Sequence, residues 1–539
     1  MNSNRSSSSS SHFNDSDFSS TSSDIANHDK FTKKRKKFSK KIKKNARISE
    51  QKHIQDILNR MDVTTGESRG KRLPQYLAAL SVCLGSVAAG SVLGWTGTIS
   101  EVLKKSALNG IPVDENVLGW ISGFATLGAM VICFPIGFIC DYIGRKWACL
   151  LTIIPFTVGW LLVIFANGTA MLYIGRFLTG IAGGAFCVAA PLYTSEIAEK
   201  EIRGALGSYF QLLLTVGILF AYVLGAFCTP QMLSIICAFI PILFGLVFFF
   251  QPETPVYLLK KRNRSGALSS LRRLRGEAYN SENEIRELQE QLDRSEQETV
   301  SFFQALQTKA AKKALFICFS LMIIQQLSGV NAVIFFTSTI FASTGGSIDP
   351  NYATIGIGVV QVTATFIASL VIDKFGRKIL LIGSAICMAL SGCLLGIYFS
   401  LNDRHLVSKE IISDLGFLPI VSLVIFISVF SLGFGPIPWM AAAEIMPPEI
   451  KSTASSAVAT FNWFLAFIVT RFFNNLVVSI GGDVTFYIFS GISLAGSVFV
   501  LLFVPETKGK TTQEIQDILS GVRPGNADSK GVENPNFKS

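Results

Sequence analysis

The string Asp141-Tyr142-Ile143-Gly144-Arg145-Lys146 ends one long apolar stretch of this sequence, and Asp373-Lys374-Phe375-Gly376-Arg377-Lys378 ends another. Two further pairs of strings repeat in the same order along the chain. Glu196-Ile197 is matched by Glu444-Ile445, and Pro252-Glu253-Thr254 is matched by Pro505-Glu506-Thr507. Three matched pairs in one order predict that the chain consists of two halves of the same design.

The apolar stretches between these strings are long enough to cross a membrane. Hydrophobic residues make up 49% of the 539 residues and charged residues only 16%, whereas soluble domains carry about 25% charged residues. Since about 20 apolar residues in a helix span a bilayer, we expect an all-α membrane protein with twelve transmembrane helices in two six-helix bundles. The expected spans are 74–96, 117–140, 147–166, 170–192, 205–226, 231–250, 314–342, 352–372, 379–400, 418–441, 453–475 and 484–504.

Basic residues are distributed unevenly over the junctions between these spans. The even-numbered junctions hold Arg145-Lys146, Arg377-Lys378 and a basic loop that starts at Lys260. The odd-numbered junctions hold few basic residues, such as Lys104 and Lys105. Because cytoplasmic loops are rich in Lys and Arg, we expect a multi-pass protein of the plasma membrane with both termini in the cytoplasm.

Polar segments divide the chain into five parts. Residues 1–73 are expected to form a disordered, Ser-rich and polybasic tail, and 74–250 the N-terminal bundle. Residues 251–312 are expected to form cytoplasmic linker helices, 313–505 the C-terminal bundle and 506–539 a cytoplasmic tail. The basic run Lys33–Lys44 is either a solvated tail that sets the topology or a clamp on anionic lipid. Since the net charge of +11 comes largely from this tail, it does not indicate a nucleic-acid partner.

Acidic and basic side chains recur where the spans are expected to meet the cytoplasm. Topology needs only Lys and Arg there, so the acids need another role. We expect ion pairs between the two bundles that form when the cytoplasmic side is shut and break when it opens. In the alternative, these residues only anchor the topology. The residues of this latch are Asp141, Arg145, Lys146, Glu196, Arg203, Asp373, Arg377, Lys378, Glu444 and Lys451.

One polar stretch lies inside an apolar run. Gln325, Gln326 and Asn331 bring three amides to membrane depth, where a polar group without a partner is costly. Ser328-Gly329 offers a break in the helix, so that all three amides would line one cavity. Because amides both donate and accept hydrogen bonds, the stretch predicts a hydroxyl-binding site in a membrane pore.

Taken together, these strings resemble the sugar porter family of the major facilitator superfamily. Further matching strings are Gly175-Arg176-Phe177 and Gly435-Pro436-Ile437-Pro438-Trp439, and the resemblance covers 74–510 in unbroken order. Spans 1, 2 and 7 are also similar to insect facilitated trehalose transporters. The resemblance implies the major facilitator fold and sugar transport by alternating access, with no cofactor, no metal and no enzymatic activity.

The resemblance also implies which side chains bind the sugar. The family's sugar-binding positions lie in spans 5, 7, 8, 10 and 11, where amides would meet sugar hydroxyls and indoles the apolar face of the sugar ring. These positions are Gln211, Gln325, Gln326, Asn331, Gln361, Trp439, Asn462 and Trp463.

Three positions depart from the glucose-transporter pattern. Gln361 and Ala466 stand where the pattern has asparagine, and Ser431 stands where it has glutamate. Two of these side chains are smaller than in the pattern, which favours trehalose or a related bulky sugar. A glucose or hexose facilitator is the alternative.

Span 1 bears on energy coupling. Proton-coupled members of the family carry an Asp there, near the arginine that corresponds to Arg176, whereas span 1 of this chain holds no acid in that region. We therefore expect facilitated diffusion rather than proton symport. Neighbouring carbonyls or amides would serve as partners of Arg176, and Arg471 is expected to snorkel to the interface.

Three remaining features of the sequence concern a sensor role, glycosylation, and metal or phosphate binding. The long N-terminal tail also suits a non-transporting sugar sensor, although sensors tend to depart from the latch strings, which are intact here. Asn167-Gly168-Thr169 is a glycosylation sequon on an expected outer turn. The ten cysteines lack metal-site spacing, and Lys508-Gly509-Lys510-Thr511 lacks the upstream glycine of a phosphate-binding loop.

Overall fold

The structure is a computed structural model that describes residues 70–106, 108–199, 201–297, 302–344, 349–447 and 449–521. The basic run Lys33–Lys44 lies outside the described residues, as do the other residues before 70 and those after 521. The described part contains helices and no strands, and twelve of its helical segments are long and apolar enough to cross a membrane. The expected all-α membrane fold is confirmed.

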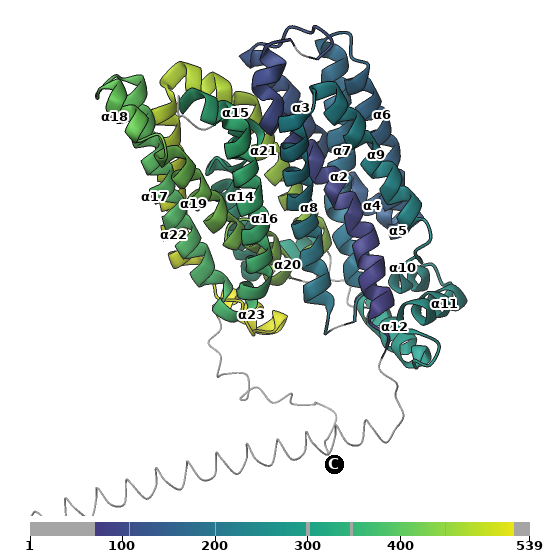
Figure 1. Ribbon diagram of the computed structural model, residues 1–539. Helices are drawn as coiled ribbons and strands as arrows, with labels where there is room; N and C mark the ends of the chain where they lie inside the picture. Colours follow the sequence, from purple (N-terminus) through teal and green to yellow (C-terminus); the bar gives the residue numbers. More distant parts are fainter. Residues whose placement is uncertain are drawn as a thin grey trace, which may run out of the picture. The chain divides into compact units, whose positions relative to one another are not determined.

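Six spans form the N-terminal bundle, and two of them are interrupted (Figure 1). The interruption in the second span precedes Pro135, which has no backbone N–H to donate. The helices of this bundle are α2 (Leu73–Lys104), α3 (Glu115–Cys133), α4 (Pro135–Ile143), α5 (Arg145–Leu151), α6 (Ile153–Ile164), α7 (Thr169–Ile197), α8 (Arg203–Phe227) and α9 (Pro230–Phe248).

The C-terminal bundle repeats this plan, with interruptions in its first and fourth spans. A short helix, α18, precedes the fourth span, and α23 follows the last one. The helices are α14 (Lys309–Leu327), α15 (Val330–Thr344), α16 (Pro350–Phe375), α17 (Arg377–Asp403), α18 (Lys409–Asp414), α19 (Leu418–Leu432), α20 (Ile437–Ile445), α21 (Lys451–Ile480), α22 (Gly482–Phe503) and α23 (Thr512–Ser520).

Four short helices lie between the bundles in the chain: α10 (Pro255–Lys260), α11 (Arg264–Arg275), α12 (Ser281–Gln297) and α13 (Phe302–Gln307). Arg275 at the end of α11 is 1% exposed and pairs with Glu199 (3.3 Å) beyond α7 and with Glu284 (3.0 Å) in α12. This buried arginine fixes α11 and α12 to the N-terminal bundle.

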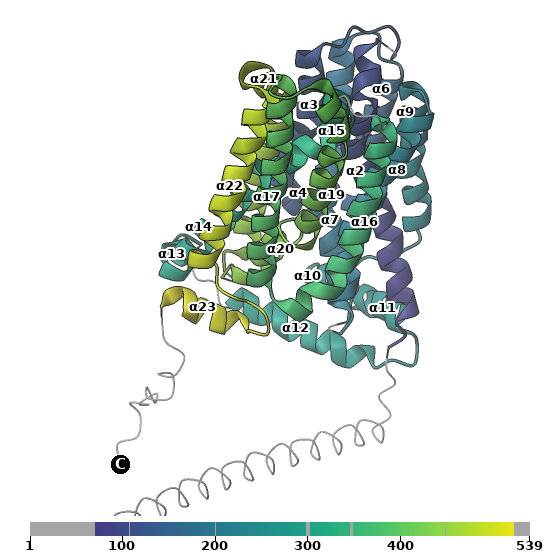
Figure 2. The same ribbon diagram turned by 60° about the vertical axis from the view of Figure 1, so that its left-hand side comes forward.

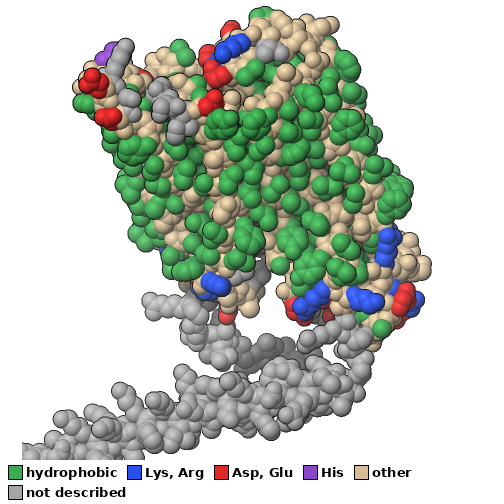
Figure 3. All heavy atoms as spheres, viewed as in Figure 1, with side chains coloured by type: hydrophobic (Ala, Val, Ile, Leu, Met, Phe, Trp, Pro, Cys, Tyr) green, Lys and Arg blue, Asp and Glu red, His purple; other side chains and the backbone are tan. Residues whose placement is uncertain are grey.

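The two ends of the bundles differ in charge. We call the end that carries Gly144-Arg145-Lys146 and Gly376-Arg377-Lys378 the basic end, and the other end the opposite end. Figure 2 shows α11, α12 and α23 at the basic end. Between the ends, apolar side chains face outward over the flanks of the spans (Figure 3), as expected for a surface in contact with lipid.

Three helix pairs join the bundles side by side: α2 with α15, α3 with α21, and α8 with α16. Each hydrogen bond between the bundles among the described residues lies in the half of the spans nearer the opposite end. Tyr222 donates to the carbonyl oxygen of Ile334 (2.7 Å), and the hydroxyls of Thr126 and Thr470 lie 3.1 Å apart. The bundles are therefore tied together at the opposite end.

Candidate functional site

Four amide side chains of the C-terminal bundle form one hydrogen-bonded chain. Asn331 Nδ2 donates to Gln326 Oε1 (2.5 Å), and Gln326 Nε2 donates to Asn462 Oδ1 (2.9 Å). Asn462 Nδ2 in turn donates to Gln325 Oε1 (2.7 Å). Gln325, Gln326 and Asn462 are buried, and Asn331 is half-buried. The four amides thus satisfy one another away from water.

Two helix breaks hold this amide chain in place. Between α14 and α15, Gly329 has a φ of +88°, which a side chain disfavours, so the expected break at Ser328-Gly329 is confirmed. Between α19 and α20 the chain leaves the helix, and Gln325 Nε2 donates to the carbonyl oxygens of Phe434 (2.6 Å) and Gly435 (3.1 Å). Polar backbone at membrane depth therefore completes the chain of amides.

The amide chain suits a ligand that is rich in hydroxyl groups. A hydroxyl both donates and accepts, so it can replace the bond between two amides and leave neither unsatisfied. One further acceptor is open: Gln361 is 3% exposed, and its Oε1 has no hydrogen-bond partner among the described residues. A buried acceptor without a partner costs about 1–3 kcal/mol, which a ligand donor would recover.

The other expected sugar contacts are not hydrogen-bonded to the four amides. Gln211 is half-buried on α8 and makes no side-chain hydrogen bond to a described residue. Trp463 lines a small cavity with Leu93 and Leu214 of the N-terminal bundle, and Trp439 is 39% exposed. The structure brings Gln325, Gln326, Asn331 and Asn462 together through hydrogen bonds. It shows no such bond to these amides from Gln211, Gln361, Trp439 or Trp463 among the described residues.

The N-terminal bundle holds a buried cation instead of an amide chain. Arg176 is fully buried, and it donates to the carbonyl oxygens of Val92 (2.9 Å) and Ile121 (3.3 Å). Its guanidinium carbon lies 5.0 Å from the centre of the Trp95 ring. Carbonyl oxygens and an aromatic face therefore serve as the partners of this charge, as the sequence allowed.

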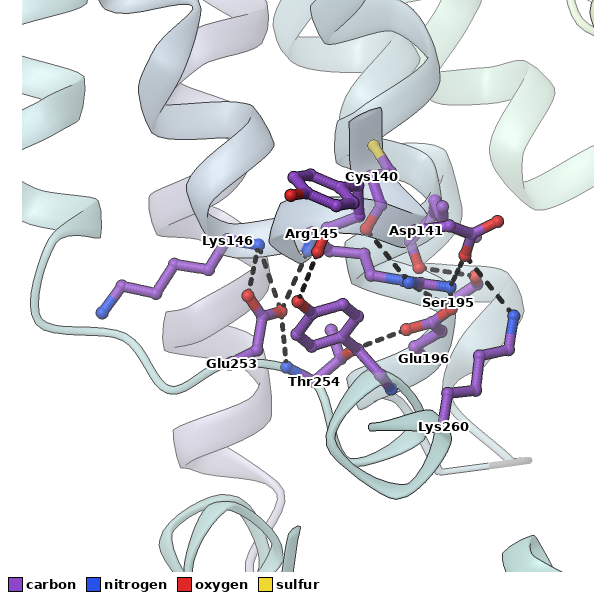
Figure 4. Close-up of polar contacts among 12 residues, drawn as sticks. Cys140, Asp141, Arg145, Lys146, Ser195, Glu196, Glu253, Thr254 and Lys260 are labelled. Carbon is purple, nitrogen blue, oxygen red and sulfur yellow. Dashed lines mark hydrogen bonds and ion pairs between the residues drawn. The ribbon is translucent and has the colours of Figure 1, made fainter. Parts of the chain in front are cut away.

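At the basic end of the N-terminal bundle, Arg145 is the centre of a network of ion pairs (Figure 4). Its Nη2 lies 2.9 Å from Glu196 Oε1 and 3.0 Å from Asp141 Oδ1. Thr254 donates its hydroxyl to Glu196 (2.6 Å), and the backbone N–H of Arg145 donates to Glu253 (3.1 Å). Gly144 permits this approach, because a β carbon there would collide with the Glu253 carboxylate.

The C-terminal bundle repeats this network at its own basic end. Arg377 Nη2 lies 3.1 Å from Glu444 Oε1, and Thr507 donates its hydroxyl to Glu444 (2.5 Å). The backbone N–H groups of Arg377 and Lys378 each donate to Glu506 (3.0 Å). The matched strings of the sequence thus fold into matched networks.

The latch expected between the bundles forms only when the basic end is shut, and it stays a prediction, because in this structure the bundles are tied together at the opposite end. The ion pairs of Arg145 and Arg377 lie within each bundle, not between the two bundles, because Glu196 and Glu444 belong to the same bundle as the arginine that they meet. Arg203 and Lys451 are exposed and make no ion pair within the described part of the chain. The side chain of Asp373 lies outside what the structure describes.

Glu253 and Glu506 were missed as members of these networks, although the repeated Pro-Glu-Thr strings were the signal. Burial raises the pKa of Glu253 above its ordinary value of 4.5, and backbone N–H donors such as that of Thr254 only partly offset this effect. Burial also opposes ionisation of Glu506, but backbone N–H donors, among them that of Lys508, outweigh it and lower its pKa. The pKa values of the two matched carboxyl groups are therefore shifted in opposite directions.

The whole of this helical region, residues 78–519, matches the family model described as sugar (and other) transporter. The chain belongs to this family. It is therefore a multi-pass membrane protein that transports sugar, and it is not an enzyme. The resemblance noted in the sequence is confirmed.

Similar proteins include the facilitated trehalose transporter Tret1 of Bombyx mori, which is 39% identical over 461 residues, or 85% of this chain and 90% of that protein. Tret1 of Anopheles gambiae is 37% identical over 448 residues, which are 83% of this chain but only 56% of that longer protein.

Solved structures show the same fold. The major facilitator proton:xylose symporter XylE bound to 6-bromo-6-deoxy-D-glucose has a TM-score of 0.65 at 23% identity, over 82% of this chain and 99% of that one. A partially occluded inward open form of the E. coli xylose transporter XylE has a TM-score of 0.66 at 20% identity, over 80% of this chain and 100% of that one. The transporter therefore has the major facilitator fold.

Arg471 does not snorkel to the surface of the transporter, contrary to expectation. It is 7% exposed and donates to Asn116 of the other bundle (2.6 Å) and to Asn475 on its own helix (3.0 Å). Its guanidinium carbon lies 4.3 Å from the centre of the Trp120 ring, which also belongs to the other bundle. An aromatic face and an amide oxygen retain this charge inside the protein and tie α21 to α3.

Proposed function

We propose that the chain is a facilitative transporter of trehalose or a related sugar in the plasma membrane, with no proton coupling and with the basic end in the cytoplasm. The observation that carries the proposal is the chain of four amides at the breaks in α14–α15 and α19–α20. Trehalose is favoured over a hexose because relatives at 37–39% identity are named facilitated trehalose transporters.

The position of the acids supports uniport. A proton-coupled carrier needs a titratable group within the membrane. Within the described spans, acids occur only within a few residues of a helix end, whereas Arg176 in the interior is held by carbonyl oxygens and Trp95. The acids of these spanning helices are Glu101, Glu115, Asp141, Glu196, Asp373, Asp403, Glu444 and Asp483.

The contacts between the bundles support alternating access. The bundles are tied at the opposite end, by Tyr222 to Ile334 and by Arg471 to Asn116, while the ion networks of the basic end stay within each bundle. This arrangement corresponds to a state that is shut at the opposite end. Transport then requires the ties at the opposite end to break and the two basic ends to approach, each held rigid by its own network.

Reconstitution into liposomes tests this proposal. We expect radiolabelled trehalose to equilibrate across the membrane to equal concentrations, with the same end point whether or not a proton gradient is imposed. Accumulation of sugar above equal concentration under an inward proton gradient would show symport and contradict the proposal.

The same assay separates the alternatives. Faster flux of glucose than of trehalose at equal concentration would identify a hexose facilitator. Saturable sugar binding without flux, in the full chain and in a variant that lacks residues 1–69, would identify a sensor. Ser431 and Ala466, whose small size suggested a bulky sugar, are buried in this structure. The ratio of trehalose flux to glucose flux therefore has to decide which sugar is transported.

A further inference from the structure

Two positive side chains at the basic end make no ion pair with any described residue. Lys146 begins α5 beside Arg145, and Arg273 lies on α11. The carboxylate of Glu253 accepts from the backbone N–H of Lys146 and not from its ammonium group, and Figure 4 shows the Lys146 side chain leading away from Glu253. Among the described residues, neither Lys146 nor Arg273 makes an ion pair.

Both cations are nevertheless held in place. The Lys146 Nζ lies 5.4 Å from the centre of the Trp147 ring and 5.3 Å from that of the Phe249 ring. Arg273 donates to the backbone carbonyl of Phe250, just beyond the C-terminal end of α9, where carbonyl oxygens favour a cation. Arg273 is also close enough for its charge to act on that of Lys146. Two like charges are thus held near each other, with the Glu253 carboxylate acting on Lys146 but making no ion pair with it.

The surface around these cations faces lipid. Trp147, Phe249 and Phe250 are 50%, 53% and 68% exposed, and their rings lie edge to face, with centres 6.2 Å and 5.8 Å apart. Trp147 and Phe249 lie on or next to spanning helices, and tryptophan at such a height is typical of the boundary between acyl chains and headgroups. In Figure 3, Lys and Arg side chains gather at the lower edge of the apolar surface, over the part that carries α10–α12.

We propose that Lys146 and Arg273 bind the headgroup of an anionic phospholipid, whose acyl chains lie against Trp147, Phe249 and Phe250. A phosphate oxygen accepts charge-assisted hydrogen bonds from ammonium and guanidinium groups, which neither cation makes with a carboxylate among the described residues. Lipid is the occupant because the aromatic side chains around the cations are exposed on the flank of the spans. The proposal does not depend on which sugar is transported.

The repeat supplies a matched control. Lys378 is the counterpart of Lys146 in the C-terminal bundle, and its ammonium donates to the carbonyl oxygen of Leu501 (2.8 Å). Because this ammonium already has a partner in the protein, Lys378 is not expected to select an anionic headgroup.

Quenching of tryptophan fluorescence by brominated lipid tests the site. The full chain is placed in phosphatidylcholine nanodiscs that contain a small fraction of either brominated phosphatidylglycerol or brominated phosphatidylcholine. Subtraction of the Trp147→Phe signal isolates Trp147. We expect phosphatidylglycerol to quench Trp147 at lower mole fraction than phosphatidylcholine, and this preference to fall by about fivefold in Lys146→Gln and again in Arg273→Gln.

Three controls make the result decisive. Arg273→Lys, which keeps the charge and reports on folding, should retain most of the preference, and Lys378→Gln should retain all of it. Excess inorganic phosphate should leave the preference unchanged, because the occupant is lipid. Equal quenching by the two lipids in the wild-type chain, an equal loss in Lys378→Gln, or abolition by inorganic phosphate would each overturn the proposal.

Discussion

The two bundles are alike at the basic end and different in the middle of the membrane. At the basic end, each has an arginine paired with a glutamate, a threonine hydroxyl on that glutamate, and a second glutamate that accepts from backbone N–H groups. In the middle, the N-terminal bundle buries Arg176 among carbonyl oxygens, whereas the C-terminal bundle carries the four amides. The repeated part is the scaffold, and the part that is not repeated carries the chemistry of the site.

The largest effect is expected from breaking the amide chain. In Gln326→Leu or Asn462→Leu, a buried amide loses its partner and the sugar loses a hydrogen-bonding group, so the initial rate of trehalose uptake should fall about a hundredfold. Thr363→Val, on an exposed position of α16, is the control and should transport normally. Normal uptake by both amide variants at equal protein level would show that the sugar binds elsewhere.

The two networks differ in burial, and this difference predicts unequal losses of stability. The side chain of Arg145 is 3% exposed where it meets Glu196, whereas that of Arg377 is 13% exposed where it meets Glu444. Arg145→Leu leaves the largely buried Glu196 carboxylate without its cation and should lower the free energy of unfolding by about 3–5 kcal/mol, and Arg377→Leu by less. Thermal unfolding of the purified variants measures the order. If Arg377→Leu proves the less stable, the ranking by burial is wrong.

The tie at the opposite end should act on conformation more than on stability. Arg471→Leu removes the contacts with Asn116 and Trp120 that join α21 to α3, so the state that is open at the opposite end should gain population several-fold. A cysteine placed at Asn331 reports this shift through its rate of alkylation from the outside. Arg404→Leu, which removes the ion pair of the exposed Arg404 with the buried Asp483 inside the C-terminal bundle, is the control. An unchanged alkylation rate in Arg471→Leu would mean that Arg471 is only a packing residue.

The smallest effect is a difference in pH dependence between the matched carboxylates. Because the pKa of Glu253 is raised above 4.5, its contribution to stability is full below pH 4.5 and is lost as the pH rises through the raised pKa. Because the pKa of Glu506 is lowered, its contribution is present above pH 4.5 and is lost as the pH falls through the lowered pKa.

Unfolding midpoints measured from about pH 2 to about pH 8 separate these two contributions, because the range must extend below the lowered pKa of Glu506. Relative to the wild-type chain, Glu253→Gln should gain stability as the pH rises, and Glu506→Gln should be less stable at neutral pH but not at low pH. If the unfolding midpoints of the two variants changed with pH in the same way, the opposite pKa shifts of Glu253 and Glu506 would be contradicted.

The sequence predicted the spans, the repeat and the break at Ser328-Gly329, since these follow from hydrophobic length and from glycine alone. It also placed Gln325, Gln326, Asn331 and Asn462 in one site. It could not predict that Arg145 and Arg377 pair within their own bundles, because sequence spacing does not say which helix end lies next to which. Arg471 was misjudged for a related reason: its partners Asn116 and Trp120 lie on a helix distant in the chain.

Equilibrium binding of radiolabelled trehalose to the purified transporter tests the central claim most directly. Saturable binding is expected in the wild-type chain and in Thr363→Val, and it should be lost in Gln326→Leu and in Asn462→Leu, because these amides are the hydroxyl-binding groups. Saturable binding of unchanged affinity in both amide variants would contradict the assignment of the sugar site to the C-terminal bundle.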